Sequence, residues 1–423
     1  MKWEKVKLGE VSRVSSSKRI FARQYVRKGV PFYRQKEIID KKNKNFIIDP
    51  LFISVETYNE IKKKFGVPVK GDLLITAVGA SLGIPYIVDD EIFYFKDGNL
   101  IWLSNFNENI NSKYIYYWIT SDIGQKMMWS RVIGSAQPAL TIDIIKQFEL
   151  SIPTYILQNK IVKILETYDK LIENNQKQIK LLEEAAQRLY KEWFVDLRFP
   201  GYENAPIIDG VPEGWSMVKV GEVIKYEIGG GWGEETIDEK FDNPAYVIRG
   251  TDLYGLTHGD FNDIPYRFHS DSNLKARKLI DGDIIFEISG GSKNEGVART
   301  ALIRSNLLKI FSEPVMCASF CKLVRFDSLE IAQYMYDTFK YLRECGKTSE
   351  FDKKSASSIV NYRWKDFLMQ QLILLPNEKI LTNYNRLAIN LYNQILCKSI
   401  LIAKLVEARD KLLPKLMSGE IEV

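Results

Sequence analysis

Residues that build disulfide frameworks and metal sites are scarce in this sequence. It has four cysteines and two histidines among 423 residues. Four cysteines in a chain of this length do not form a disulfide framework, so we expect a reducing compartment. Cys317 and Cys321 lie in an apolar run, where buried free cysteines are common, and we expect no metal site.

Long apolar stretches are also missing. No run approaches the roughly 18 apolar residues that a membrane span needs, and Met1–Val11 carries charges where a signal peptide would be apolar. These absences predict a soluble, cytoplasmic protein with no membrane partner. The 45% of hydrophobic and 12% of aromatic residues are enough for real cores, and 423 residues suit two or three domains.

Motifs of ATP-binding and methyl-transferring enzymes occur only as fragments. Gly346-Lys-Thr348 resembles the end of a P-loop, but Tyr341 stands where the pattern needs a glycine. Asn243-Pro-Ala-Tyr246 resembles the adenine-holding loop of amino-methyltransferases, and Gly229–Gly233 resembles a cofactor loop. In such enzymes the two loops lie on different strands separated by further βα units, whereas here they are close neighbours in sequence. We therefore expect a turn at Asn243-Pro before a strand over Ala245–Ile248.

The sequence contains two copies of one ordered pattern. Its landmarks recur as pairs: Trp3–Val11 and Trp215–Val223, Pro31–Arg34 and Tyr246–Arg249, Gly71–Ile75 with Gly79 and Gly282–Phe286 with Gly290, Phe148–Pro153 and Gln371–Pro376, and Glu184-Ala185 and Glu407-Ala408. The offset between the members of a pair drifts from 212 and 211 to 223 residues, which indicates loops of different length on one scaffold.

Each copy begins with a region that mixes strands and helices. Short β-branched and aromatic runs bounded by turn residues predict strands at Asp72–Val78, Ile84–Val88 and Ile92–Phe95. A helix is expected over Ser112–Met128. The fold class predicted for each globular region is therefore α+β.

A long helix follows each mixed region. Residues spaced alternately by four and three form one seam at Ile161, Leu165, Tyr168, Ile172, Asn175, Ile179, Leu182, Ala186, Leu189 and Trp193, and a second at Tyr384, Ala388, Leu391, Ile395, Lys398, Ile402, Leu405, Arg409, Leu412 and Leu416. A helix of about 33 residues makes a rod of about 50 Å. The two seams favour an antiparallel coiled coil over two separate core helices. The sequence leaves open whether the helices pair within one chain or between two.

These features divide the chain into four segments: 1–153 and 201–376 as globular domains, and 154–200 and 377–423 as helices. The first domain has 23 Lys+Arg and 16 Asp+Glu, a net +7, whereas the second has 21 and 26, a net −5. The positive charge suits the first domain to a polyanion such as DNA. Two globules on paired rods fit a reader of two separated half-sites.

The duplicated pattern resembles the specificity subunit of type I restriction-modification systems. The resemblance rests on the Leu8-Gly-Glu10 and Val220-Gly-Glu222 starts, the Gly71-Asp-Leu-Leu and Gly282-Asp-Ile-Ile elements, the exit from Gly134-Ser-Ala-Gln137 through Pro153 to Gln158, and Lys415–Ile421 at the C-terminal end. The second copy departs from the pattern, since Thr348–Phe351 replaces the Gly-Ser-Ala-Gln stretch and Asn383 or a neighbour stands where a glutamine is usual.

The resemblance implies that this chain binds double-stranded DNA without catalysing a reaction. It implies two target-recognition domains, each reading half of a bipartite, asymmetric site, and two helices that act as a ruler. Two methyltransferase subunits would dock on the helices and methylate adenine N6 with S-adenosylmethionine. Restriction subunits would supply ATP-driven translocation and cleavage. No cofactor is then expected on this chain, and S-adenosylmethionine, ATP and Mg are expected on its partners.

Candidate DNA-binding residues are polar and basic side chains on loops, because base edges and phosphates are read by such groups. In the first domain they are Lys18, Arg19, Arg34, Gln35, Ser81, Arg131, Ser135 and Gln137, and in the second Arg249, Thr251, Ser289, Lys293, Lys347, Lys353 and Lys354. Gly79 and Gly290 are expected to shape turns. Two other functions stay open at this point: a protein-scaffolding adaptor with a coiled-coil spacer, and a stand-alone adenine-N6 methyltransferase.

Overall fold

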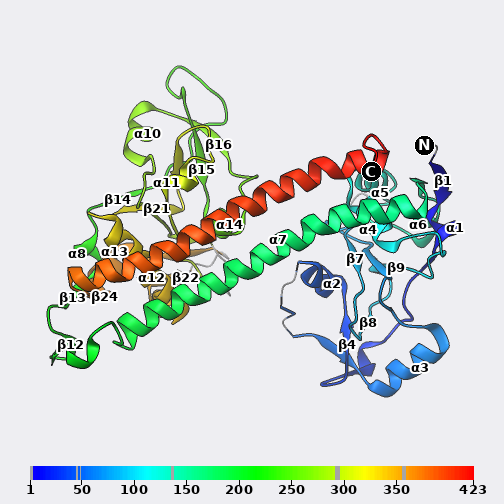
Figure 1. Cartoon of the computed structure of the whole chain (residues 1–423), viewed down its shortest axis with the longest axis horizontal. Coiled ribbons are helices and arrows are strands. Elements are labelled where there is room, and N and C mark those ends of the chain that lie inside the picture. Colours follow the sequence, from blue (N-terminus) through cyan, green and yellow to red (C-terminus); the bar gives the residue numbers. More distant parts are fainter. Residues whose placement is uncertain (1–2, 44–45, 48, 135–137, 291–295, 355–358) are drawn as a thin grey trace. The chain divides into compact units, whose positions relative to one another are not determined.

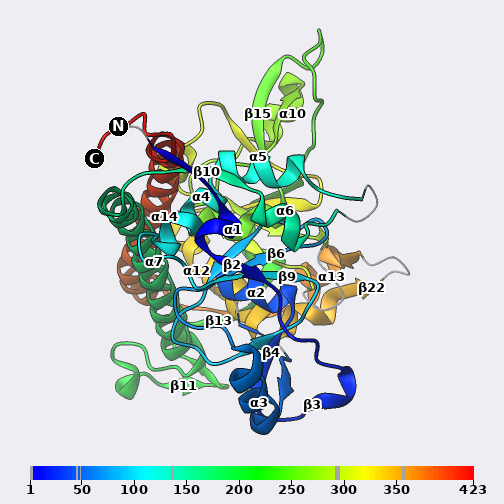
Figure 2. The ribbon, with the colours of Figure 1, turned by 90° about the vertical axis from the view of Figure 1, so that its right-hand side faces the viewer.

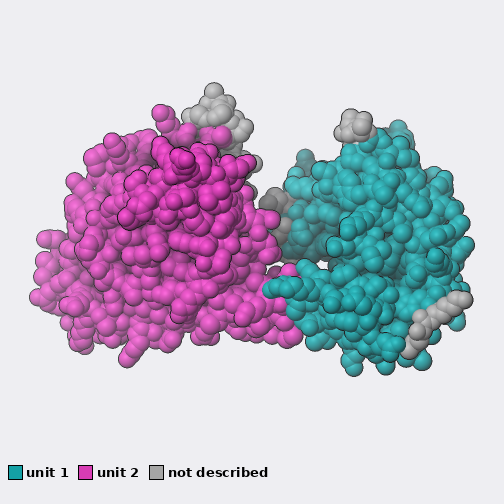
Figure 3. Space-filling view, turned by 90° about the horizontal axis from the view of Figure 1, so that it is seen from above, with its two compact units in different colours: residues 1–170, 407–423 teal, residues 171–406 magenta. Residues whose placement is uncertain are grey.

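The computed structural model describes residues 3–43, 46–47, 49–134, 138–290, 296–354 and 359–423 (Figure 1). The chain forms two compact units (Figure 3). Unit 1 contains Met1–Lys170 and Glu407–Val423, and unit 2 contains Leu171–Val406. The domain boundaries predicted at residues 153, 200 and 376 separate globular regions from long helices, whereas each compact unit contains both kinds of segment. These boundaries stay predictions.

Unit 1 has two four-stranded sheets, ordered β2-β9-β6-β7 and β3-β5-β4-β8, and a β1-β10 pair. Its elements are β1 (Glu4–Lys7), α1 (Leu8–Val11), β2 (Arg13–Ser15), the 3₁₀ turn Ala22–Gln24, β3 (Tyr25–Val26), β4 (Val30–Tyr33), α2 (Gln35–Lys42), β5 (Leu51–Ile53), α3 (Val55–Phe65), β6 (Leu73–Thr76), β7 (Pro85–Ile87), β8 (Tyr94–Phe95), β9 (Leu100–Ser104), α4 (Ser112–Thr120), α5 (Asp122–Ser130), α6 (Ile142–Lys146) and β10 (Glu149–Ile152).

Unit 2 has sheets ordered β14-β21-β17-β19, β16-β15-β20 and β18-β23-β22, and a β13-β24 pair. Its elements are β11 (Ile207–Ile208), β12 (Val211–Pro212), β13 (Ser216–Lys219), α8 (Val220–Val223), β14 (Tyr226–Gly229), β15 (Asn243–Ile248), α9 (Leu253–His258), β16 (Tyr266–His269), α10 (Asp271–Arg277), β17 (Ile284–Glu287), β18 (Ser289–Gly290), β19 (Thr300–Leu302), α11 (Ser305–Leu308), β20 (Val315–Cys317), β21 (Cys321–Arg325), α12 (Leu329–Glu344), β22 (Asp352–Lys354), β23 (Val360–Tyr362), α13 (Trp364–Gln370) and β24 (Leu372–Leu375), with 3₁₀ turns at Tyr202–Asn204, Gly250–Asp252 and Lys347–Phe351.

The two units repeat one topology. The order β2-β9-β6-β7 matches β14-β21-β17-β19, and β5-β4-β8 matches β16-β15-β20. In both second sheets one neighbour of the central strand is antiparallel and the other is parallel. The sequence repeat is therefore a repeat of structure, and the predicted α+β class is confirmed.

The repeated Gly-Asp element forms the same turn in both units. The glycine has a φ of +91° in the first copy and +88° in the second, a conformation that other residues rarely adopt. Asp72 accepts hydrogen bonds from the amide three residues before it, at 3.0 Å, and from the Trp102 indole, at 2.8 Å. Asp283 accepts from the equivalent amide at 2.7 Å and from the Arg325 guanidinium at 2.7 Å. Since Trp102 and Arg325 lie on the equivalent strands β9 and β21, the element ties a turn to the sheet.

Helices α7 (Tyr155–Tyr190) and α14 (Glu378–Ser418) each take part in both units. A π-helical turn, Lys191–Val195, follows α7. The helices pair within one chain, and both views of the ribbon show them side by side (Figures 1 and 2). In unit 2, Ile172 and Ile179 of α7 pack with Ile395 and Ile402 of α14.

The helix expected within Ser112–Met128 is present as α4 and α5, because Ser121 ends α4 and caps α5 by accepting from the Gly124 amide at 3.3 Å. One predicted element differs from the structure. The turn expected at Asn243-Pro is part of β15. Pro244 is tolerated there because only residues 246–248 of β15 also pair with β20.

The buried Gln158 side chain joins the first globular region to the start of α7. Its amide oxygen accepts from the Asn111 backbone at 2.9 Å, and its amide nitrogen donates to the Asn109 and Pro153 carbonyls at 3.1 and 3.0 Å. In unit 2, Asn385 is similarly buried and donates to the Glu330 and Leu381 carbonyls.

We expect Gln158→Ala to destabilise unit 1 by about 2–3 kcal/mol, because it leaves buried backbone groups without partners. Hydrogen exchange of the backbone around Asn111 should accelerate. The control, Gln176→Ala, changes an exposed glutamine of the same helix and should stay within about 0.5 kcal/mol of wild type. Equal exchange rates in both variants would contradict this role of Gln158.

Candidate nucleic-acid interface

One arginine follows the central strand of the second sheet in each unit. Arg34 follows β4 and Arg249 follows β15. The backbone N–H of each donates to an acid three residues on, Glu37 or Asp252, at 2.8 Å in both cases. The guanidinium donates to the same carboxylate, through Nε and Nη2. Each arginine is thus fixed at its backbone and its side chain by one acid.

Both guanidiniums nevertheless remain accessible. The side chains of Arg34 and Arg249 are 42% and 37% exposed, whereas their partners Glu37 and Asp252 are 2% and 10% exposed. Hydrogen bonding to the acid raises the pKa of each arginine above its ordinary value. Burial acts to raise the pKa of Glu37, but the hydrogen bonds from Arg34 outweigh it and the pKa is lowered. Both members of the first pair are therefore charged at neutral pH.

In unit 2 three predicted residues, Arg249, Thr251 and Ser289, line one cavity of 550 Å³. Trp232 and Phe320 also line it, with 39% and 57% of their surfaces exposed. The structure thus brings together polar and aromatic side chains from segments that are far apart in the sequence.

A buried ion pair lies at the same cavity. Arg299 donates through Nε to Glu287 at 2.8 Å, and Glu287 is 1% exposed. A Cβ at Gly250 would come within 2.4 Å of the Glu287 carboxylate, so a larger residue there would have to displace this side chain. The lining of the cavity is therefore fixed by packing and by charge.

In unit 1 Arg34 is followed by Gln35, which supports a neighbouring loop. The Gln35 amide donates to the Val78 carbonyl at 2.8 Å, and the carbonyl of Ser81 accepts from the Thr76 hydroxyl. Gly79 lies between them with a φ of +75°, as a turn requires. The side chains of Gln35 and Ser81 are both only partly exposed. Their contacts with DNA stay predictions.

The other candidates lie on separate parts of the surface. Lys18, Arg131, Lys347 and Lys353 are exposed, and Arg19 is 67% exposed although it pairs with Asp97 at 2.7 Å. The remaining candidates, Ser135, Gln137, Lys293 and the side chain of Lys354, lie outside the described residues.

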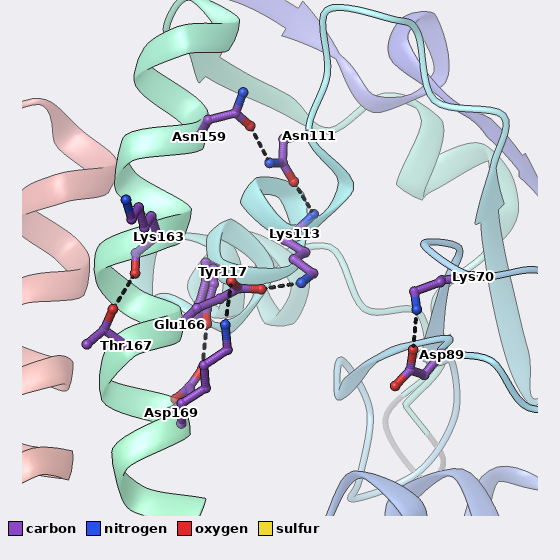
Figure 4. A network of polar contacts seen from close by, with 11 residues as sticks. Lys70, Asp89, Asn111, Lys113, Tyr117, Asn159, Lys163, Glu166, Thr167 and Asp169 are labelled. Atoms are coloured by element: carbon purple, nitrogen blue, oxygen red, sulfur yellow. Dashed lines mark hydrogen bonds and ion pairs between the residues drawn. The ribbon is translucent and has the colours of Figure 1, made fainter.

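The long helices carry polar contacts as well as an apolar seam. Asp169 of α7 accepts from the Tyr117 hydroxyl of α4 at 2.5 Å (Figure 4). It also accepts from the Arg409 guanidinium of α14 at 2.8 Å. Asp169 therefore joins the seam residue Arg409 to the first globular region. The predicted seam positions Leu165, Ile172, Asn175, Ile179, Ile395 and Ile402 are buried, and Tyr168, Leu182, Lys398 and Leu405 are partly buried.

The sequence and the fold of this chain are similar to those of known proteins. A model of the type I restriction modification DNA specificity domain matches residues 1–184. The type I restriction enzyme MjaIX specificity subunit of Methanocaldococcus jannaschii is 26% identical over 328 residues, 75% of this chain and 70% of that protein. A putative specificity subunit of Haemophilus influenzae, S.HindORF215P, is 31% identical over 187 residues, 44% of this chain and 45% of that protein. The crystal structure of an S subunit from M. genitalium has a TM-score of 0.58 at 14% identity, covers 98% of this chain and 96% of that chain, and supports the fold.

The first 184 residues match the type I restriction-modification DNA specificity domain, and the chain is similar to the specificity subunits of these systems. Members of this family are DNA-recognition components that assemble with other subunits, and they are not catalytic. The predicted resemblance is confirmed.

The enzyme-like fragments of the sequence have structural roles. Asn243 lies in β15 and donates to the His269 carbonyl at 3.3 Å, so its segment does not form an adenine-holding loop. Cys317 and Cys321 are buried, and burial raises the pKa of Cys317 to about 12. Within the described ranges, no group of three acidic, histidine or cysteine side chains is placed to hold a metal ion. No described helix is long and apolar enough to span a bilayer.

Sequence reasoning missed the acids that hold the two arginines and the aromatics of the cavity. One signal for the acids was available, because Arg34-Gln-Lys-Glu37 and Arg249-Gly-Thr-Asp252 share the same spacing at equivalent positions of the repeat. Trp232 and Phe320 carried no such signal, since they lie in loops that differ in length between the copies.

Proposed function

We propose that this specificity subunit reads a bipartite DNA site, with one half-site for each globular domain. The carrying observation is that both units present an acid-held arginine at the same position of the same topology. Arginines held in this way suit base reading, which requires directed donors. The different net charges of the domains, +7 and −5 by residue counts of 23 minus 16 and 21 minus 26, favour two unlike half-sites.

We assign the spacer and docking role to α7 and α14. Paired helices suit this role because each takes part in both units and is held in each unit by contacts with the other helix. Two methyltransferase subunits would bind them and supply adenine-N6 methylation from S-adenosylmethionine. Restriction subunits would add ATP- and Mg-dependent translocation and cleavage. The complex would act on double-stranded DNA in the cytoplasm.

Methylome sequencing of cells with and without this gene tests the proposal, provided that the partner methyltransferase is expressed. We expect one bipartite adenine-methylation motif to disappear on deletion and to return on complementation. An unchanged methylome would overturn the proposal and favour a protein-scaffolding adaptor. Methyl transfer from labelled S-adenosylmethionine by the purified chain alone would instead support a stand-alone methyltransferase.

A further inference from the structure

The two acid-held arginines can be compared donor by donor. In both, the edge of the guanidinium formed by Nε and Nη2 faces the carboxylate. A guanidinium has five N–H donors, so Nη1 and the outer N–H of Nη2 remain on the opposite edge. For Arg34 no hydrogen bond to this outer edge is formed by the residues that the structure describes.

The charge of each pair favours a base over a phosphate as its ligand. Phosphate contacts draw their strength from net positive charge and counterion release. The carboxylate of Glu37 or Asp252 compensates its arginine, so each pair adds little net charge. What remains is a set of donors in a fixed direction, which is what reading a base edge requires.

Resting on the proposed function, we propose that Arg34 reads a guanine in the major groove of one half-site and that Arg249 makes one contact with a base acceptor in the other. Guanine presents two acceptors side by side, O6 and N7, which match the two parallel donors of a guanidinium edge. Adenine offers one acceptor beside an amino donor, cytosine offers a donor, and thymine offers one acceptor beside a methyl group. Guanine is the one base that satisfies both donors.

The two arginines differ in the number of donors left. The second N–H of Arg249 Nη2 donates to the Asp263 carbonyl at 2.9 Å. Only Nη1 of Arg249 is then left for DNA, whereas Arg34 retains both Nη1 and Nη2. Arg34 therefore makes the bidentate contact and the stronger discrimination, and Arg249 makes a single contact at the cavity lined by Trp232 and Phe320.

The test is the methylome of cells that carry the complete system with Arg34→Lys or Arg249→Lys. Lysine keeps the charge but loses the planar pair of donors. For Arg34→Lys we expect the preference for guanine at one position to fall by about tenfold to a hundredfold, the range of a bidentate contact. For Arg249→Lys we expect a smaller loss of base preference, at one position of the other half-site. Arg23→Lys, which changes an exposed arginine of unit 1, should leave the motif unchanged.

A second variant, Glu37→Gln, removes the acid and keeps the arginine. The freed guanidinium should lose base preference, while binding of the assembled complex to non-specific DNA should gain a salt-dependence slope steeper by roughly 0.9. If Arg34→Lys abolishes methylation altogether, the inference is tested by binding of the complex that carries Glu37→Gln to duplexes with each of the four bases at that position. A guanine preference retained by this complex overturns the inference, and so does an unchanged motif in both lysine variants. Failure of the proposed function is distinct, since no motif would then depend on the wild-type gene.

Discussion

Replacing Ile179 with aspartate is expected to separate α7 from α14 in unit 2. Ile179 is fully buried and packs in a small cluster with Ile172, Ile395 and Ile402. The substitution removes the apolar contacts of one of four isoleucines and places a carboxylate among the other three, whose side chains offer it no polar partner. Losing a buried isoleucine alone costs about 2–5 kcal/mol, and burying an unpaired polar group adds to this. We therefore expect a loss of more than about 4 kcal/mol.

Hydrogen–deuterium exchange of the two helices measures this effect. Amides of residues 171–182 and 392–406 should lose their protection together, because each helix covers the apolar face of the other. Leu181→Asp is the matched control, since Leu181 lies on the same helix but is 63% exposed. It should change the stability by less than about 0.5 kcal/mol. Protection in Ile179→Asp equal to that in the control would show that the cluster does not hold the helices together.

The paired helices were predictable from sequence because a heptad seam depends on residues close together along the chain. A seam position repeats every three or four residues, so its burial follows from local periodicity. The role of Arg409 did not follow. Its partner Asp169, which also accepts from Tyr117, lies more than two hundred residues away in sequence, and only the antiparallel pairing brings the two together. The polar residue in the seam therefore indicated a contact other than apolar packing, but the sequence did not show which residue was its partner.

The repeat made the topology predictable, but it did not reveal the interface. Equivalent landmarks such as Gly71 and Gly282 form the same turn in both units. Self-comparison also pairs Arg249 with Arg34 and Gly290 with Gly79, but it does not show which segments line a common cavity. Arg249 and Thr251 follow β15 of one sheet, whereas Ser289 lies on β18 of another, and only the fold brings them to one cavity.

Asp337 is expected to be the most sensitive buried polar group of unit 2. It is 4% exposed and accepts hydrogen bonds from Tyr384 at 2.7 Å, from Gln333 at 3.0 Å and from Tyr392. Asp337→Ala removes the acceptor for all three donors, so we expect a loss of about 3–5 kcal/mol. Protection of α12 and α14 in hydrogen exchange should fall accordingly. A loss below about 1 kcal/mol would mean that water replaces the carboxylate.

The same group predicts a pH dependence with a definite sign. Burial raises the pKa of Asp337, although hydrogen bonds from its partners oppose the shift. Because the folded pKa lies above the unfolded one, the contribution of Asp337 to stability is full below the unfolded pKa and declines as pH rises through the folded value. Asp337→Asn cannot titrate, so the stability of wild type minus that of the variant should fall with rising pH, by at most about 1.4 kcal/mol per pH unit. Taking this difference cancels the titration of other carboxylates. A difference that is flat from acid to neutral pH would contradict the raised pKa, and one that grows would mean that the hydrogen bonds outweigh burial.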